Sequence, residues 1–277
     1  MTTIKLYNKH VHTADDKVTM DCYLCPKQPG LDQEPSPAVI IFPGGGYSFT
    51  SDREAAPIAN TFVAAGYSAF VVWYTVAPNC EGINPLLDAA QAVYTVRTRA
   101  EEFRIDPKKI AVCGFSAGGH LAGHISTAWN STIISEKLGI ENTLVRPDAS
   151  ILCYPVISGI DHPNVESFRM LFGSDAPSRE ELESASLEKL VDDRTCPAFV
   201  WHTSSDDCVP VENSLLYCAA LAAHNIPFEL HVFPVGPHGL SLADRQTCPS
   251  CYSSYVAKWV QLCLKWCENV FYGGNFR

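Results

Sequence analysis

The sequence predicts an α/β fold in which a mostly parallel sheet of about eight strands is flanked by helices. Two observations lead to this prediction. Short apolar stretches typical of strands alternate with helical patterns along most of the chain, which favours a parallel sheet covered on both faces. The chain also has 277 residues, of which 47% are hydrophobic, enough for a substantial core. We expect one domain over residues 1–277.

The strand-like stretches share runs of apolar and β-branched residues bounded by polar or turn-forming ones. They are Ile4–Tyr7, Val18–Leu24, Ala38–Phe42, Ser68–Trp73, Ile110–Cys113, Ala149–Tyr154, Ala198–His202 and Phe228–Phe233. Among the helices, Ser51 and Glu54 have the spacing of a capping box. Asn84, followed by a proline, is expected to open a long helix towards Phe103, and another helix is expected from Val211 to His224.

Two segments fit this alternation poorly. Residues 129–147 and 155–195 are polar and are interrupted by Gly, Pro and Ser, so we expect them to be excursions at the edge of the sheet. Both are candidate lids. The chain shows no internal repeat, low-complexity tract or linker that would divide it.

The charge balance bears on partners and location. Thirty acidic residues against twenty basic ones give a net charge of −10, which argues against a nucleic-acid partner and favours a neutral or cationic small molecule. No apolar run approaches the roughly 18 residues of a membrane helix, and the first residues lack the layout of a secretory signal. We therefore expect a cytoplasmic protein without a membrane partner. The oligomeric state stays open.

The twelve cysteines allow a different class of protein. Cys22/Cys25 and Cys248/Cys251 form two C-x-x-C pairs, whose spacing suits a zinc site or a redox centre. The first pair, however, lies in a strand-like stretch whose alternation points its thiols away from a common centre. The other cysteines are scattered, several of them in apolar segments, and need not pair in a reducing compartment.

The strongest motif surrounds Ser116. In the stretch "KIAVCGFSAGGHLA", an apolar strand leads into small residues and then into a helical pattern. Gly114 and Gly118 permit the sharp strand-to-helix turn that would lift the Ser116 hydroxyl clear of the sheet. A glycine-rich loop between a strand and a helix is also common in proteins that have no catalytic serine. Whether Ser116 is a nucleophile therefore depends on a base and a carboxylate elsewhere in the chain.

Two later strands supply those partners. Asp206 and Asp207 follow the seventh strand in "FVWHTSSDDCVP", and His238 follows the eighth in "HVFPVGPHGLSLA". The carboxyl ends of parallel strands are where open α/β sheets assemble their sites. A base must take the serine proton and a carboxylate must orient the base, and Ser, then Asp, then His is the chain order of α/β hydrolases.

A glycine loop after the third strand supplies a fourth element. In "IIFPGGGYS", Gly44, Gly45 and Gly46 let the backbone approach a substrate closely, so that N–H groups can point at an oxyanion. Ala117 adds its own N–H at the start of the following helix. A phosphate-binding loop is the alternative, but neither of its glycine patterns matches here.

Together, "PGGGY", "CGFSAGGHLA", "HTSSDDCVPVENS" and "GPHGLSLA" resemble the bacterial carbohydrate acetyl esterases, the acetylxylan-esterase-like branch of the α/β-hydrolase superfamily. The resemblance implies an α/β-hydrolase fold, with Asp206 rather than Asp207 as the acid. It also implies Gly45, Gly46 and Ala117 as the oxyanion hole. One departure stands out: the histidine that begins the H-G-G-G loop of related lipases is Pro43 here, so the orientation of the loop must come from elsewhere.

Other polar residues need a place as well. His120 and His124 lie four apart on the helix after Ser116, without the glutamate of a metalloprotease motif, and we expect His120 to pack and hydrogen-bond beneath the turn. We expect His202 to be a satisfied core residue. Tyr47 and His162 are candidates for the substrate pocket, although an aromatic residue at the start of a loop is often only a plug.

The resulting hypothesis is a serine carboxylesterase that removes short acyl groups, above all acetyl groups from xylo-oligosaccharides or related carbohydrates, through an acyl-enzyme. Ser116, Asp206 and His238 would be catalytic, and no metal or organic cofactor is expected. The alternative within the same fold is an amidase or peptidase of small substrates. A non-catalytic binding protein on a hydrolase scaffold is the alternative from another class.

Overall fold

A computed structural model describes residues 1–27, 30 and 34–273. All eight predicted strands are present and form one sheet in the order β1-β2-β4-β3-β5-β6-β7-β8. Their bounds are Thr2–Lys5 (β1), Thr19–Tyr23 (β2), Ser36–Phe42 (β3), Ser68–Trp73 (β4), Ile105–Phe115 (β5), Ala149–Cys153 (β6), Ala198–Thr203 (β7) and Phe228–Phe233 (β8).

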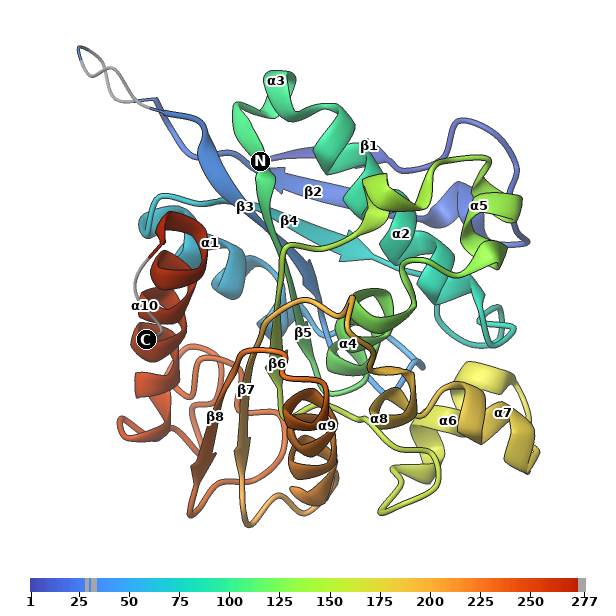
Figure 1. Ribbon diagram of the computed structural model, residues 1–277. Coiled ribbons are helices and arrows are strands. Elements are labelled where there is room, and N and C mark those ends of the chain that lie inside the picture. Colours follow the sequence, from blue (N-terminus) through green and yellow to red (C-terminus); the bar gives the residue numbers. More distant parts are fainter. Residues whose placement is uncertain (28–29, 31–33, 274–277) are drawn as a thin grey trace.

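The direction of the strands brings the loops that carry the predicted site residues to one edge of the sheet. Strand β2 is antiparallel to β1 and to β4, whereas every other neighbouring pair is parallel. The carboxyl ends of β3, β5, β6, β7 and β8 therefore lie together, at the lower end of the sheet in Figure 1. The prediction of a mostly parallel sheet is confirmed.

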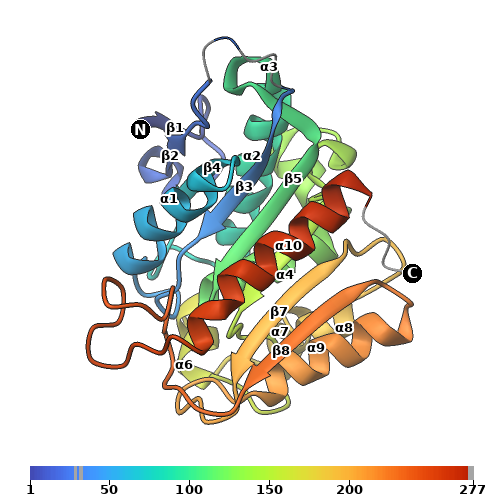
Figure 2. The same cartoon turned by 90° about the vertical axis from the view of Figure 1, so that its left-hand side faces the viewer.

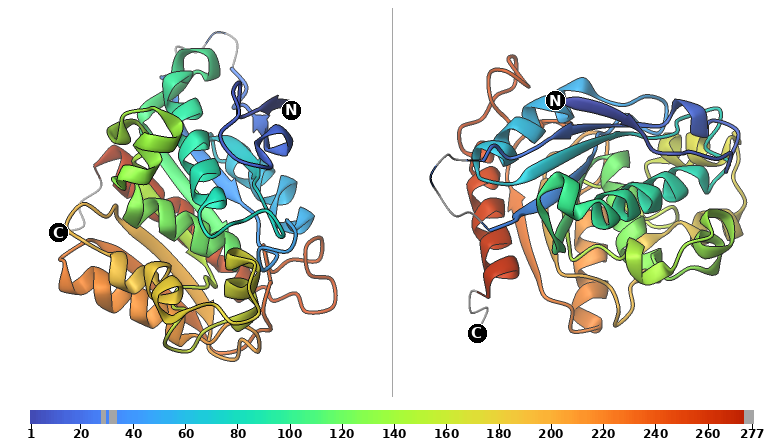
Figure 3. Two further views of the ribbon diagram at one scale, coloured as in Figure 1. Left: turned by 90° about the vertical axis from the view of Figure 1, so that its right-hand side faces the viewer. Right: turned by 90° about the horizontal axis from the view of Figure 1, so that it is seen from above.

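Helices cover both faces of the sheet. One face carries α1 (Ala56–Ala64) and α10 (Trp259–Tyr272), which lie in front of the strands in Figure 2. The other carries α2 (Asn84–Thr98), α4 (Ala117–Ala128), α8 (Leu187–Leu190) and α9 (Glu212–Ala223), seen on the left of Figure 3. Each face buries its own apolar cluster.

Strand β3 shows how the sequence serves both clusters. Ala38, Ile40 and Phe42 belong to the cluster under α2, α4 and α9, whereas Val39 and Ile41 belong to the one under α1 and α10. Successive side chains of a strand point to opposite faces, so a strand covered on both faces has to be apolar at every position.

Two helix predictions need correction. The helix expected to run from Asn84 towards Phe103 is interrupted at Arg99, which leaves the helical conformation (φ −101°, ψ 25°) before a short helix, α3 (Ala100–Phe103). The interruption turns the Phe103 ring into the core, 5.0 Å from the ring of Phe70.

The predicted capping box at Ser51 and Glu54 is wrong. Ser51 makes no side-chain cap hydrogen bond, and residues Asp52–Glu54 form a short 3-10 helix. Glu54 is buried and does not cap this turn, because its carboxylate bonds to two groups elsewhere in the fold. A capping box does occur at α7 (Arg179–Ser184), between Ser178 and Glu181.

The two candidate lids lie in different places. Residues 129–147 form α5 (Thr132–Leu138) and the 3-10 helix Asn142–Val145, both of which pack against α2. Residues 155–195 form α6 (Val165–Phe172), α7 and α8, and Figure 1 shows α6 and α7 beside the carboxyl ends of the strands. Only the second segment is therefore placed to cover that edge, and its role as a lid stays a prediction.

The cysteines do not form a metal centre. Cys248 and Cys251 are joined by a disulfide in the loop between β8 and α10, whereas Cys22 and Cys25 are free thiols at β2, near the opposite edge of the sheet. Within the described residues, no group of three or more His, Cys, Asp or Glu side chains is placed to hold a metal ion. The zinc alternative is wrong because the sheet separates the two pairs.

None of the helices in the described part of the chain is long and apolar enough to cross a bilayer.

Candidate active site

Ser116 occupies the turn between β5 and α4 with a positive φ (φ 55°, ψ −119°) that is uncommon for serine. Its neighbours show why glycine is needed there. A methyl group at Gly114 would lie 1.9 Å from the carbonyl oxygen of Gly118, and one at Gly118 would lie 2.1 Å from that of Phe42. The Ser116 carbonyl accepts hydrogen bonds from two amides, those of His120 and Val156, so the turn is held on both sides.

The structure brings three predicted side chains into one hydrogen-bonded chain. Nε2 of His238 lies 2.7 Å from Oγ of Ser116, and Nδ1 of His238 lies 2.7 Å from Oδ2 of Asp206. Ser116 follows β5, Asp206 follows β7 and His238 follows β8, so all three lie at the common carboxyl edge of the sheet. Such a chain lets the imidazole take the serine proton while the carboxylate fixes its tautomer.

Asp206 is the carboxylate that contacts the imidazole, and its surroundings keep it ionised. Its side chain is 1% exposed, and Oδ1 accepts hydrogen bonds from the amides of Cys208 and Val209. Burial raises the pKa of the Asp206 carboxyl, but the hydrogen bonds from His202 and His238 outweigh it and hold the pKa well below its usual range. Asp207 is exposed, and among the described residues its carboxylate accepts a hydrogen bond from the backbone amide of His238 alone, at 3.3 Å.

His202 supports Asp206, as expected of a satisfied core histidine. Its Nε2 lies 2.9 Å from the carbonyl of Val209 and 3.3 Å from Oδ2 of Asp206, so this nitrogen must carry the proton. Its Nδ1 lies 2.8 Å from Oγ of Ser214 on α9. The histidine thereby ties the acid loop to the helix behind it.

The loop that carries His238 is held by the C-terminal helix. Nε1 of Trp259, the first residue of α10, donates to the carbonyl oxygen of Ser241 at 3.0 Å. The indole stacks on that of Trp201 in β7, with the ring centroids 5.2 Å apart. The position of the imidazole therefore depends on the packing of α10 against the sheet.

The glycine loop has the backbone that an anion cradle requires. Gly45 (φ 135°) and Gly46 (φ 62°) adopt conformations that L-residues rarely take, and a methyl group at Gly45 would lie 2.1 Å from the carbonyl oxygen of Phe49. The amides of Gly45, Gly46 and Ala117 donate no hydrogen bond within the described part of the chain. Three free donors thus belong to the two segments that flank Ser116.

Two polar side chains hold this loop in the absence of a histidine at position 43. Glu54 Oε2 accepts from the amide of Gly44 at 2.8 Å, and the Tyr74 hydroxyl donates to the carbonyl of Pro43 at 2.7 Å. Sequence reasoning missed both residues. The spacing of Glu54 from Ser51 pointed to a helix cap, and nothing in the sequence distinguishes Tyr74 from an ordinary core tyrosine.

Tyr47 is not a pocket residue. It is fully buried, and its hydroxyl lies 2.7 Å from Nδ1 of His120, whose Nε2 lies 2.8 Å from the carbonyl of Ala185. The expectation that His120 packs and hydrogen-bonds beneath the turn is confirmed. Tyr47 therefore has a packing role, which was the alternative to a role in the pocket.

A pocket of about 340 Å³ opens over Ser116 and His238. Gly45 and Gly46 line it on one side, and residues at the start of α6 line it on another. Polar side chains with charge of both signs line it, from Ser48, Arg53, Asn164, Glu166 and Ser167, together with the exposed ring of Phe49. His162 is exposed and is not among the residues that line it, nor is any residue of 129–147.

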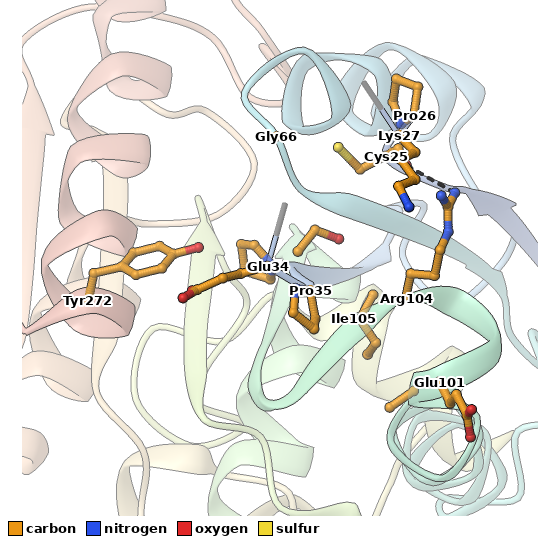
Figure 4. A pocket seen from close by; sticks show the side chains of 13 residues that line it. Cys25, Pro26, Lys27, Glu34, Pro35, Gly66, Glu101, Arg104, Ile105 and Tyr272 are labelled. Atoms are coloured by element: carbon orange, nitrogen blue, oxygen red, sulfur yellow. Dashed lines mark hydrogen bonds between the residues drawn. The ribbon is translucent and has the colours of Figure 1, made fainter. Parts of the chain in front are cut away.

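A second pocket, of about 420 Å³, lies at the opposite end of the parallel strands. Figure 4 shows side chains from four separate segments around it, among them Cys25, Glu34, Arg104 and Tyr272. Arg104 donates there to the carbonyl of Cys25, at 3.4 Å. Among the described residues that line this pocket there is no histidine to act as a base for the Cys25 thiol.

Among curated proteins, two relatives are named as a xylanase and an acetylxylan esterase. The chain is 39% identical over 209 residues to endo-1,4-beta-xylanase B of Butyrivibrio fibrisolvens, covering 74% of this chain and 33% of that protein. It is 30% identical over 230 residues to an acetylxylan esterase of Xylanibacter ruminicola, covering 81% and 44%, respectively. The chain thus spans less than half the length of either relative.

Solved structures match along nearly the whole chain. An acetyl ester-xyloside bifunctional hydrolase from Caldicellulosiruptor lactoaceticus is 36% identical with a TM-score of 0.83, covering 99% of this chain and 97% of that one. A carboxylesterase from Lactobacillus plantarum is 29% identical with a TM-score of 0.77, covering 91% and 92%. Residues 20–221 match the BD-FAE family. The predicted α/β-hydrolase fold is confirmed, and the chain belongs to the BD-FAE family.

Proposed function

We propose that this protein is a serine carboxylic ester hydrolase in which Ser116 is the nucleophile, His238 the general base and Asp206 the residue that orients the base. The observation that carries the proposal is the continuous hydrogen-bonded chain from Ser116 Oγ through His238 to Asp206, which opens onto a pocket. A serine hydroxyl becomes a competent nucleophile when a positioned imidazole can take its proton.

The reaction follows from this geometry. Ser116 Oγ attacks the ester carbonyl carbon while its proton passes to Nε2 of His238, and the carbonyl oxygen becomes an oxyanion. The free amides of Gly45, Gly46 and Ala117 stabilise that charge. The intermediate then collapses, the bond to the alcohol oxygen breaks, and the proton on Nε2 passes to the leaving alcohol. Water repeats these steps on the acyl-enzyme, releasing the carboxylic acid and the free serine.

For the substrate, we propose short acyl esters and above all acetyl groups on xylo-oligosaccharides. The pocket of about 340 Å³ lies at the small end of the range of ligand sites, and Ser48, Asn164, Glu166 and Ser167 offer hydrogen-bonding groups to a hydroxyl-rich alcohol. The names of two similar proteins, an acetylxylan esterase and an acetyl ester-xyloside hydrolase, support the same class. We further propose a single domain in which residues 155–195 form a small polar cap.

The test is the replacement Ser116→Ala, with Ser135→Ala on the distant helix α5 as the matched control. We expect Ser116→Ala to lower kcat for 4-nitrophenyl acetate by roughly 10⁴-fold or more, because the remaining donors and the pocket supply only a small part of the acceleration. Circular dichroism should show an unchanged fold. A fluorophosphonate should add its mass to the peptide containing Ser116 in the wild type and in Ser135→Ala, but not in Ser116→Ala.

Near-normal hydrolysis by Ser116→Ala would remove this residue from the mechanism. Release of acetate from acetylated xylo-oligosaccharides, measured by an enzyme-coupled acetate assay, tests the substrate separately. A triad that hydrolyses the nitrophenyl ester but releases no acetate from the oligosaccharides would keep the ester hydrolase and exclude the carbohydrate substrate.

A further inference from the structure

Glu54 joins two loops of the site through one buried carboxylate. It follows β3 in the 3-10 helix Asp52–Glu54, and the residue is 3% exposed. Both carboxylate oxygens are used: Oε2 accepts from the amide of Gly44 at 2.8 Å, and Oε1 accepts from the hydroxyl of Tyr154 at 2.7 Å. A buried carboxylate without such donors would be costly, so the two hydrogen bonds account for its presence in the core.

The first hydrogen bond fixes the start of the glycine loop. Gly44 directly precedes Gly45, the first of the proposed oxyanion donors. A methyl group at Gly44 would lie 2.7 Å from Oε2 of Glu54 and 3.1 Å from Cβ of Ser116, so carboxylate, loop and nucleophile are packed around one point. Glu54 therefore lies against the backbone at the start of the loop that faces Ser116.

The second hydrogen bond reaches the loop of the base. Tyr154 follows β6, and its hydroxyl, besides donating to Glu54, accepts from the amide of Ser241 at 2.8 Å. Its ring packs edge-to-face against the imidazole of His238, with the centroids 5.0 Å apart and the planes at 72°. Burial, and then the charge of Glu54, raise the pKa of the Tyr154 hydroxyl well above its usual value, so it stays a donor to the carboxylate.

We propose that Glu54 is a positioning residue that fixes the glycine loop and the His238 loop relative to each other, directly through Gly44 and indirectly through Tyr154 and Ser241. The inference rests on the proposed ester hydrolysis and extends it. Donors that stabilise an oxyanion act only when they are held in place before the reaction, and the base must face the same carbonyl. Glu54 holds a loop that lacks a histidine at position 43, and its contact with Tyr154 connects it indirectly to the loop of the base.

The variants separate the two connections. In Glu54→Gln, the amide oxygen can keep the hydrogen bond from Gly44, whereas the NH₂ group can only donate to the Tyr154 oxygen, so the stronger hydrogen bond from the hydroxyl to a charged carboxylate is lost. Tyr154→Phe breaks the same connection from the other end. We therefore expect each of the two to lower kcat for 4-nitrophenyl acetate by about 10-fold to 100-fold, with KM changed less than about threefold. The double variant should be no slower than the slower single variant, since both remove one connection.

Glu54→Ala removes both connections, and we expect it to lower kcat by about 10³-fold, a loss as large as that of an oxyanion donor. Asp52→Asn, an exposed change two residues away, is the matched control and should leave kcat unchanged. Glu54→Gln keeps the side-chain volume and decides the case if Glu54→Ala does not fold.

Hydrogen exchange gives a readout that does not need activity. Peptides containing Gly44 and Ser241 should both exchange faster in Glu54→Ala, only the Ser241 peptide should do so in Glu54→Gln, and neither should change in Asp52→Asn. Unchanged exchange at both peptides in Glu54→Gln and Glu54→Ala, or additive losses of kcat in the double variant, would overturn the proposal. If the wild type hydrolysed no ester, the proposed function would fail, and exchange alone would still decide whether Glu54 couples the two loops.

Discussion

Replacing Asp206 by Asn tests the arrangement of the site most directly, because the surroundings of this residue dictate which way the new amide must face. Oδ1 of Asp206 accepts from two backbone amides, those of Cys208 and Val209. An asparagine will keep its oxygen on that side and turn its NH₂ group towards His238 and His202. The NH₂ group then donates to Nδ1 of His238, which moves the imidazole proton to Nε2.

That tautomer presents an N–H to Ser116 and cannot take the hydroxyl proton. The variant therefore loses both the function of His238 as a base and the negative charge of Asp206 that stabilises the imidazolium. We expect kcat to fall by roughly 10⁴-fold, as in other triads whose carboxylate becomes an amide. This loss corresponds to about 5 kcal/mol of transition-state stabilisation. Asp207→Asn is the matched control. It alters only the 3.3 Å contact with the backbone amide of His238 and should change kcat less than about threefold.

The assay is hydrolysis of 4-nitrophenyl acetate at pH 7, with the enzyme concentration taken from the absorbance at 280 nm and the fold of each preparation checked by circular dichroism. The two variants differ by one position in the chain and by the same chemical change, so an unspecific effect on folding would appear in both. An Asp206→Asn variant that retained more than about a tenth of the wild-type kcat would refute the reasoning. So would an equal loss in Asp207→Asn.

Two further predictions concern substrate size and acid stability. The size of the pocket predicts that kcat/KM is highest for acetyl or propionyl nitrophenyl esters and at least roughly tenfold lower for octanoyl esters. This ratio corresponds to about 1.4 kcal/mol in transition-state binding. Equal kcat/KM values for acetyl and octanoyl esters would contradict the short-chain assignment. Burial lowers the pKa of His124 to about 3, below the value near 6.5 in the unfolded chain. This neutral histidine therefore lowers the free energy of unfolding as pH falls below 6.5. In urea titrations, His124→Gln should lose about 2 kcal/mol less than the wild type between pH 7 and pH 5, and an unchanged difference would argue against this coupling.

The sequence was informative where the signal is local. The strands, the small residues around Ser116 and the order of Ser116, Asp206 and His238 can be read from short windows, because each depends on periodicity or turn geometry within a few residues. The choice of Asp206 over Asp207 came from a resemblance. In the structure, two amides of the same turn bind Asp206, and such a turn is not visible in the residue types.

The sequence was misleading where a side chain acts far from its neighbours in the chain. Glu54 has the spacing of a helix cap, but its hydrogen-bond partners include Tyr154, 100 positions away. Tyr47 stands beside the glycine loop and yet turns inward to His120. The break at Arg99 likewise depends on packing that brings Phe103 against Phe70. Tertiary contacts override local preference in all three cases. The residues in contact are far apart in the chain, so no short stretch of sequence shows these contacts.

The dependence of the His238 loop on Trp259 has a consequence for the order in which the molecule is made. A ribosome delivers the chain from its amino terminus, so Ser116 and Asp206 emerge well before the imidazole, and the imidazole before the helix that holds its loop. Strand β8 lies at the edge of the sheet and pairs with β7, and α10 follows it in the chain. A nascent chain therefore carries the nucleophile and the acid without a held base. The proposed chemistry can therefore begin only after α10 has been synthesised and has packed against the sheet.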